Sequence, residues 1–217
     1  MNFSAQGTQL SLFGDDDAGL GSVSREAGTT PDAGGDAKPQ AAAESTPAAE
    51  PQLPAGVREH QYGEPVGRIR PEYDLIIATD GSCSGNPGPG GWAFVEQTRG
   101  YAQSGGARAT TNNIMELTAM LRALEYAGPD ADLLLRVDSK YVIDSMTKWA
   151  AGWRRRGWKK ADGKPVLNRD LIEPILNLYE ARRGKTDVEW VRGHQGDPAN
   201  ELADTLAVEQ TALHARK

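Results

Sequence analysis

Four acidic side chains are spaced so that a folded α/β chain would bring them together: Asp80, Glu116, Asp138 and Asp204. Asp80 and Asp138 each directly follow a short apolar run that is typical of a buried strand. If the two strands are parallel neighbours, both carboxylates emerge at the same carboxyl edge of the sheet. Open α/β sheets bind their ligands at this edge.

The other two acids fall in segments with helical periodicity. Glu116 is followed at helical spacing by Met120 and Ala123, and Asp204 by Ala207. Residues at this spacing share one face of a helix, and an apolar face packs against the core. We therefore expect the Glu116 carboxylate to face the sheet and the Asp204 carboxylate to point partly inward.

Each acid alone has a simpler explanation, as a turn residue, a helix-boundary residue or a solvated side chain. Four carboxylates on inward faces, however, would repel one another, raise each other's pKa and destabilise the fold. A pair of hard divalent cations can neutralise them, and Mg²⁺ prefers oxygen ligands of this kind. Two such ions about 3.5–4 Å apart support phosphodiester cleavage, in which one activates water and the other stabilises the leaving oxygen.

A histidine lies in a glycine-flanked loop before the last expected helix. His194 follows Gly193 and is separated from Gly196 by one residue. A lone histidine is usually structural or merely exposed. Beside a carboxylate cluster, a mobile loop of this kind favours a role in proton transfer.

A basic stretch with interleaved tryptophans lies between residues 149 and 169, and Asp162 is its one acid. Its tryptophans and cations are Trp149, Trp153, Trp158, Arg154, Arg155, Arg156, Lys159, Lys160, Lys164 and Arg169. A solvated helix end whose tryptophans reach the core would have the same composition. The local excess of positive charge favours a nucleic acid instead, with its phosphates on the cations and its sugars or bases on exposed tryptophan.

The elements that must position these groups follow from the hydrophobic pattern. Strands are expected at residues 75–79, 92–95, 101–104, 133–137 and 186–191, and helices at 111–128, 140–153, 169–183 and 198–214. This order predicts an α/β fold with a mixed five-stranded sheet flanked by helices.

The chain divides into an acidic tail and a neutral domain. The first 72 of the 217 residues carry 11 acidic and 5 basic side chains, which accounts for the whole formal net charge of −6. From residue 18 to residue 56 the composition is mostly Ala, Gly, Pro, Ser, Thr and acid, too poor in large apolar side chains to offset the loss of backbone entropy. We therefore expect a disordered tail over residues 1–72 and one catalytic domain over residues 73–217.

The sequence also limits where the protein works. Its single cysteine, Cys83, excludes an intramolecular disulfide and zinc sites built on paired cysteines. No run of about 18 apolar residues occurs, so no membrane span is expected. The first residues lack the basic start and apolar core of a secretory signal. We expect a cytoplasmic protein.

Five short segments resemble, in order, the motifs of type I ribonuclease H, the bacterial ribonuclease HI family. They are residues 80–91 (DGSCSGNPGPGG), 111–117 (TNNIMEL), 137–142 (VDSKYV), 191–196 (VRGHQG) and 200–204 (NELAD). The basic segment, residues 153–160 (WRRRGWKK), is similar to the basic protrusion of that family. The likeness extends over roughly residues 73–213.

The resemblance implies a ribonuclease H-like fold and an endonuclease that hydrolyses the RNA strand of RNA–DNA hybrids, leaving 5′-phosphate and 3′-hydroxyl ends. It implies that Asp80, Glu116, Asp138 and Asp204 bind two Mg²⁺ ions, with Mn²⁺ as a substitute. His194 would assist proton transfer or product release. The implied partner is the hybrid, bound by a monomer.

The resemblance also implies a set of substrate contacts. Near the minor groove and the DNA strand these would be Cys83, Asn86, Thr111, Asn112 and Asn113. From the basic segment they would be Trp153, Arg154, Arg155, Arg156, Trp158, Lys159 and Lys160. Recognition of 2′-hydroxyls distinguishes RNA from DNA.

The tail carries a second resemblance. Residues 9–13 (QLSLF) resemble the short peptide by which bacterial replication and repair proteins bind the sliding clamp. The residues implied in binding are Gln9, Leu10, Leu12 and Phe13. Glutamine would hydrogen-bond at one end, while the leucine–phenylalanine pair would fill an apolar pocket. A chance match of five residues is the alternative.

Two other functions remain open at this point. A DNA-cutting nuclease or integrase of the same superfamily would share the acidic cluster, but Asn112, Asn113 and the basic segment argue against it. A non-catalytic nucleic-acid-binding module is a different class of protein. It would gain nothing from four acids facing phosphates.

Overall fold

The structure is a computed structural model that describes residues 56–193 and 196–216. The predicted disorder of residues 1–55, the clamp-like peptide at residues 9–13 and His194 all lie outside the described residues.

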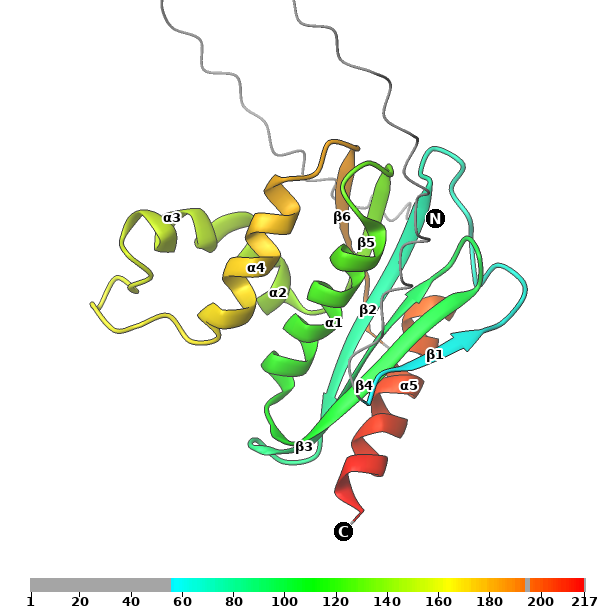
Figure 1. Ribbon diagram of the computed structural model, residues 1–217, viewed down its shortest axis with the longest axis horizontal. Coiled ribbons are helices and arrows are strands. Elements are labelled where there is room, and N and C mark those ends of the chain that lie inside the picture. The colour runs from blue at the N-terminus through cyan, green and yellow to red at the C-terminus, as the bar shows by residue number, and fades with distance from the viewer. Residues whose placement is uncertain (1–55, 194–195, 217) are drawn as a thin grey trace, which may run out of the picture. The chain divides into compact units, whose positions relative to one another are not determined.

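The described residues form one mixed sheet of six strands (Figure 1). Its strands are β1 (Arg58–Gln61), β2 (Leu75–Cys83), β3 (Gly88–Glu96), β4 (Tyr101–Thr110), β5 (Leu133–Val137) and β6 (Thr186–Trp190). Their order in the sheet is β1-β4-β3-β2-β5-β6, with β5 parallel to β2 and β6 parallel to β5. The five strands expected from the sequence are all present, and the mixed α/β layout is confirmed.

The centre of the sheet is the parallel pair β2 and β5. Their register pairs Leu75 with Leu133 and Thr79 with Val137. Both strands are buried along this stretch, as expected of parallel strands covered on both faces. The register places Asp80 and Asp138 side by side, because each follows directly after the last matched pair.

Strand β2 continues beyond its apolar run. The sequence predicts a strand ending at residue 79, whereas β2 extends through Asp80 to Cys83 because it pairs there with β3, Asp80 with Ala93 and Cys83 with Gly90. The acid therefore projects from a hydrogen-bonded strand and not from a loop.

The sixth strand lies upstream of the expected domain boundary. The sequence assigns residues 56–72 to the tail, but β1 pairs antiparallel with the edge of β4. The Tyr101 hydroxyl donates a hydrogen bond to Glu59, and His60 Nε2 lies 2.9 Å from Ser104 Oγ. Strand β1 is held by backbone pairing and polar contacts, so it needs no apolar residues. Without an apolar run, nothing in the sequence marks it as a strand.

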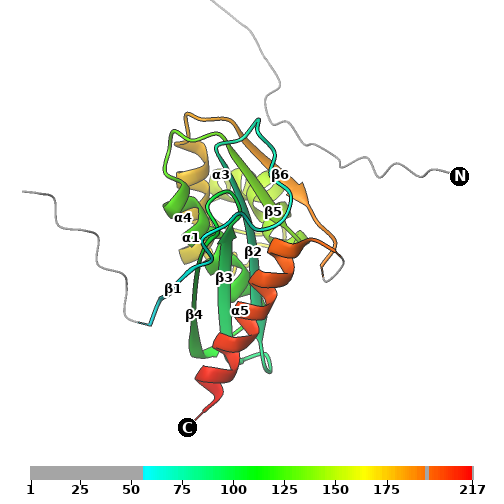
Figure 2. The ribbon, with the colours of Figure 1, turned by 90° about the vertical axis from the view of Figure 1, so that its right-hand side faces the viewer.

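Helices cover both faces of the sheet. They are α1 (Asn112–Ala127), α2 (Lys140–Asp144), the π-helix η1 (Ser145–Trp149), α3 (Ala150–Arg155), α4 (Arg169–Glu180) and α5 (Pro198–Ala215). The helix expected at residues 140–153 is therefore interrupted by a π-helical turn. Helices α1 and α4 pack on one face, and α5 crosses the other (Figures 1 and 2).

Adjacent glycines in β3 show how closely the two layers of helices approach. A Cβ atom on Gly90 would meet the Met115 side chain of α1 at 3.0 Å, and one on Gly91 would meet the Ala207 carbonyl oxygen of α5 at 2.1 Å. A run as rich in glycine and proline as residues 85–91 is typical of a turn. The last glycines of this run instead lie in the strand, where their lack of a side chain admits a helix on each face.

Among residues 56–193 and 196–216, no helix combines the length and the apolar composition needed to cross a membrane.

Candidate active site

Three of the four predicted acids converge at the centre of the sheet. One carboxylate oxygen from each of Asp80, Glu116 and Asp138 lies within 4.8 Å of the other two. Asp80 and Glu116 are buried, and Asp138 is partly buried. They come from β2, from the second turn of α1 and from the residue after β5.

Glu116 reaches this position because α1 packs directly against the backbone of β2. A Cβ atom on Gly81 would lie 2.3 Å from the Glu116 amide nitrogen, so only glycine fits there. The Thr111 side chain caps the start of α1 by accepting a hydrogen bond from the Ile114 amide. Gly81 was not among the site residues predicted from the sequence. A glycine directly after a strand acid is the signal that another backbone, here that of α1, approaches closely.

The fourth acid approaches from the opposite face. Asp204 lies on α5, is partly buried and shares a hydrogen bond with Asp80. This face of α5 points partly inward, as expected, because Ala207 is buried whereas its neighbour Val208 is 48% exposed. Asp204 therefore joins the site through Asp80 and lies at its edge.

The cluster is electrostatically strained without a cation. Burial, followed by repulsion from Asp138 and Asp204, raises the pKa of Asp80 to about 8. Burial, followed by repulsion from Asp80 and Asp138, raises the pKa of Glu116 well above its usual range. The Gly81 amide opposes the first shift by donating a 2.8 Å hydrogen bond to Asp80 Oδ1. Asp138 therefore makes both Asp80 and Glu116 harder to ionise.

These residues fit a hard divalent cation. Glu116 Oε2 is buried and has no hydrogen-bond partner among the described residues, while Oε1 accepts only a long 3.4 Å bond from Asn112 Nδ2. A buried carboxylate oxygen without a partner is costly, and a metal ion would satisfy it. An all-carboxylate donor set is typical of Mg²⁺ or Mn²⁺ and not of zinc.

The segment that carries the predicted histidine passes beside the cluster. His194 itself lies outside the described residues, but a Cβ atom on the preceding Gly193 would be 2.7 Å from Asp138 Oδ2. Trp190 Nε1 donates a 3.1 Å hydrogen bond to the Asp138 carbonyl oxygen. The Lys140 ammonium lies 5.1 Å from the centre of the Trp190 ring. Trp190 is 46% exposed, and the sequence analysis gave it no role at the site.

The predicted minor-groove residues surround the start of α1. Asn112 and Asn113 are exposed at its first turn, next to the capping Thr111. Asn86 is exposed in the β2–β3 loop. Cys83 is partly buried, and its thiol lies 3.5 Å from the Thr110 carbonyl oxygen. The loop and the helix start are therefore neighbours.

The basic segment, residues 153–160, presents most of its cations to solvent. Arg155, Arg156 and Lys159 are exposed. Arg154 differs, because it pairs with Glu180 at 2.8 Å and donates a hydrogen bond to Asn177. Its charge is therefore partly offset before any nucleic acid binds.

The two outer tryptophans of the basic stretch differ in exposure. Trp158, predicted to contact the nucleic acid, is only 6% exposed, whereas Trp149 is 40% exposed. The chain turns back after α3, with Trp158 N donating to the Trp153 carbonyl oxygen, and the Trp158 ring lies under the Arg169 guanidinium at 5.2 Å. This turn, which has no apolar signal of its own, directs most of the Trp158 ring into the core, and its contact with nucleic acid stays a prediction.

Comparison with known proteins agrees with this geometry. Residues 72–212 match the model of the RNase H family. The chain is 47% identical over 144 residues to the ribonuclease H of Nitratidesulfovibrio vulgaris strain DP4, a match that covers 65% of this chain and 91% of that protein. It is 49% identical over 141 residues to the ribonuclease H of Maricaulis maris, covering 64% of this chain and 93% of that protein.

Solved structures share the fold. LC9-RNase H1, a type 1 RNase H with the type 2 active-site motif, matches with a TM-score of 0.56 and 29% identity over 64% of this chain and 72% of that one. LC11-RNase H1, solved in complex with RNA/DNA hybrid, matches in fold with a TM-score of 0.50 and 24% identity over 66% of this chain and 100% of that one. The family match spans most of the described domain and includes all four acids, so the chain belongs to the ribonuclease H family of enzymes.

Proposed function

We propose that this enzyme hydrolyses the RNA strand of RNA–DNA hybrids with two Mg²⁺ ions held by Asp80, Glu116, Asp138 and Asp204, leaving 5′-phosphate and 3′-hydroxyl ends. The observation that carries the proposal is the buried cluster in which oxygens of three carboxylates lie within 4.8 Å of one another. Mn²⁺ has the same oxygen preference and is expected to substitute.

The chain's own residues set up the reaction. The acids would supply oxygen ligands from two helices, from β2 and from the residue after β5, so the cations would be held at a fixed place at the sheet. Such ions, when bound, activate water and stabilise the leaving oxygen. Asn112 orients Glu116 through its hydrogen bond to Oε1. We assign His194 the transfer of a proton near Asp138, because Gly193 brings its segment against that carboxylate.

The choice of substrate rests on the exposed groups around the cluster. Asn86, Asn112 and Asn113 carry amides that can both donate and accept hydrogen bonds, which suits 2′-hydroxyls and base edges in a minor groove. LC11-RNase H1, which shares this fold, was solved with an RNA/DNA hybrid. A DNA-cutting nuclease would not need a set of groups that recognises 2′-hydroxyls.

The tail and the cellular setting complete the proposal. From the pattern of Gln9, Leu10, Leu12 and Phe13 we propose that the tail binds a bacterial sliding clamp. A flexible linker would raise the local concentration of the enzyme near the DNA held by that clamp. We propose a cytoplasmic monomer, in keeping with a single cysteine and a substrate formed during DNA replication and repair.

The raised pKa values couple metal binding to protons. The carboxyl group of Asp80 has an ordinary pKa of 3.8 and a pKa of about 8 in the metal-free fold. Between these pH values the folded state binds more protons than the unfolded state, so the metal-free protein loses stability as the pH rises. Protons and Mg²⁺ compete for the same oxygens, so metal affinity rises over the same pH range.

Asp138→Asn is expected to lower the rate of hybrid cleavage by more than about a hundredfold while binding of the hybrid persists. The change keeps the side chain's size but removes a charge that attracts metal, and the basic segment is untouched. The measurement is single-turnover cleavage of a labelled RNA–DNA hybrid, with duplex DNA and duplex RNA as alternative substrates. Asp130→Asn, in a surface ion pair with Arg183, serves as the control and should cleave like wild type. Cleavage of duplex DNA alone would refute the proposed substrate.

Asp80→Asn is expected to raise the melting temperature of the chelator-treated protein at pH 8 and to flatten its fall between pH 5 and pH 8.5. The reason is that asparagine keeps the acceptor for the Gly81 amide but removes a charge that the fold destabilises. Mg²⁺ should stabilise wild type more than the variant. Scanning calorimetry with chelator and with Mg²⁺ measures both effects. A variant less stable than wild type in chelator at pH 8 would show that the acids are not in conflict.

Replacing Arg155, Arg156, Lys159 and Lys160 with alanine is expected to weaken hybrid binding and reduce its salt dependence. Each lost phosphate contact lowers the slope of log affinity against log salt by roughly 0.7–0.9. Arg154→Ala is the matched control, and it should change the slope less because Glu180 already offsets that charge. Fluorescence anisotropy at several salt concentrations gives the slopes, and an unchanged slope would exclude these cations from the interface.

Replacing Leu12 and Phe13 with alanine is expected to abolish binding to a bacterial sliding clamp and leave cleavage of a short free hybrid unchanged. Titration calorimetry measures the first effect and a cleavage assay the second. Ser11→Ala, in the same peptide, should bind like wild type. Absence of binding by wild type at high clamp concentration would make the peptide a chance match.

A further inference from the structure

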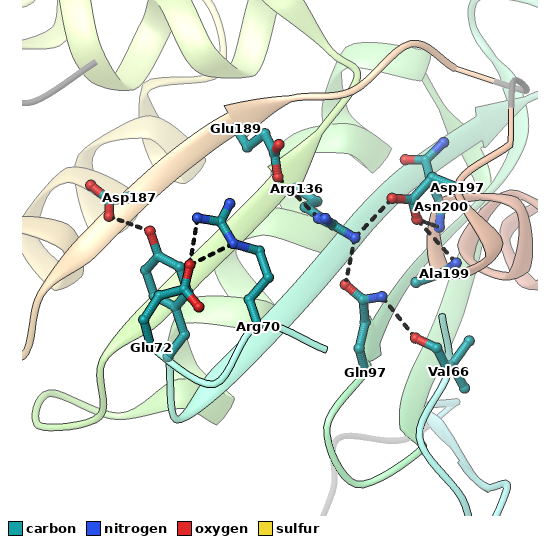
Figure 3. A network of polar contacts seen from close by, with 11 residues as sticks. Val66, Arg70, Glu72, Gln97, Arg136, Asp187, Glu189, Asp197, Ala199 and Asn200 are labelled. Atoms are coloured by element: carbon teal, nitrogen blue, oxygen red, sulfur yellow. Dashed lines mark hydrogen bonds and ion pairs between the residues drawn. The ribbon is translucent and has the colours of Figure 1, made fainter. Parts of the chain in front are cut away.

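A buried arginine lies on the same face of β5 as the active-site acid. Arg136 precedes Asp138 by two residues and is 8% exposed (Figure 3). Its Nε donates a 3.1 Å hydrogen bond to Glu189 Oε2 on the neighbouring strand, and its Nη1 donates to Asp197 Oδ2 at 2.9 Å and to Gln97 Oε1 at 3.3 Å. One guanidinium therefore joins β6, the end of β3 and the start of α5.

The contact with Asp197 is the one that reaches the active site. Asp197 is the N-cap of α5, and its Oδ1 accepts hydrogen bonds from the Ala199 amide at 3.1 Å and the Asn200 amide at 3.0 Å. One carboxylate oxygen thus caps the helix and the other binds Arg136. Asp204 follows on the same helix about two turns later.

The packing of α5 explains why this contact matters. The helix meets the sheet through Ala199, Ala203, Leu206 and Ala207, which pack on Ala78, Ala93, Val95 and Ala102 of the strands. These mostly small side chains allow a close approach, since a Cβ atom on Gly91 of β3 would meet the Ala207 carbonyl oxygen at 2.1 Å. The polar contact at the start of α5 adds a restraint that is specific in direction to this apolar packing.

Gln97, which accepts a hydrogen bond from Arg136, is itself held in place by its neighbours. Its side chain is fully buried and donates a 2.7 Å hydrogen bond to the Val66 carbonyl oxygen (Figure 3). A Cβ atom on Gly67 would lie 2.9 Å from Gln97 Nε2 and 3.6 Å from Pro198. Pro198, the first residue of α5, and Gln97, whose amide oxygen accepts from Arg136, therefore both pack against the segment of Val66 and Gly67.

We propose that Arg136 is a positioning residue that, through Asp197, holds α5 in the place where Asp204 meets Asp80. This inference rests on the proposed function, because it gives Asp204 a share in metal binding. Removing Arg136 would leave the helix capped but no longer tied to β5. Glu189 is the internal control, because it contacts the same guanidinium from β6 and not from α5.

The test compares Arg136→Gln, Asp197→Asn and Glu189→Gln. Asparagine is as good an N-cap as aspartate, so in Asp197→Asn the one remaining oxygen keeps the helix start, while an amide donor replaces the oxygen that accepts from Arg136 and the charge pair is lost. The first two variants should each lower kcat and the affinity for Mg²⁺, measured by calorimetry without substrate, by about tenfold or more, with KM for the hybrid nearly unchanged. The Arg136→Gln/Asp197→Asn double variant should lose no more than either single one, because both break the same contact.

Glu189→Gln should keep wild-type Mg²⁺ affinity and kcat, whatever its melting temperature. The proposal is overturned if Arg136→Gln and Asp197→Asn lower only the melting temperature, or if Glu189→Gln affects metal binding equally. If Arg136→Gln fails to fold, Asp197→Asn alone decides, because its Arg136 still pairs with Glu189. If wild type does not cleave the hybrid, the proposed function fails, while the calorimetric comparison still tests the role of Arg136.

Discussion

The repulsion among buried carboxylates is the constraint that the rest of this structure must withstand. Asp80, Glu116 and Asp138 are brought close enough that burial and mutual repulsion raise the pKa of both buried acids. A flexible site would relax by moving the charges apart. Here the acids are fixed because β2 and β5 are apolar, buried strands in parallel register, and the same register that buries their side chains also aligns the acids.

Glycine makes this proximity possible. Gly81 lets the backbone of α1 lie against β2, and Gly193 lets the segment after β6 pass beside the Asp138 carboxylate. A Cβ atom would collide with the Glu116 backbone at the first position and with an Asp138 carboxylate oxygen at the second. The distance between the acids is thus set by backbone contacts, which are less able to adjust than side-chain contacts.

The sequence was sufficient for the parts whose signals are local. An apolar run followed by an acid identified β2, β5, Asp80 and Asp138, and helical spacing placed Glu116 on the inward face of α1. The sequence could not reveal β1, because a polar edge strand held by backbone pairing has no hydrophobic pattern. It also could not show that Trp158 turns inward, since this depends on a turn with a left-handed backbone at Trp158 itself, where φ is 61°.

Arg136 illustrates a different limit. Within the apolar run of β5 it looks like an interruption, and its three partners are 39, 53 and 61 residues away in the sequence. No periodicity or motif links such distant residues. Only the fold shows that the charge is buried, compensated by two carboxylates and connected to the cap of α5.

The two helices that carry acids pack differently. Helix α1 buries large side chains, including Leu117, Met120 and Leu124, in the main core. Helix α5 packs mostly through alanines and Leu206, and two polar contacts also hold it, Asp197 to Arg136 at its start and Thr211 to the Ser82 carbonyl oxygen near its end.

The two helices also bring their acids to different places in the cluster. Glu116, on α1, lies within the group of three acids, whereas Asp204, on α5, lies outside that group and reaches it through Asp80. Ionic and hydrogen-bonded contacts are specific in direction but sensitive to the loss of a single partner. On the α5 side of the site, a few polar residues that are not themselves among the four acids therefore help to determine where Asp204 lies.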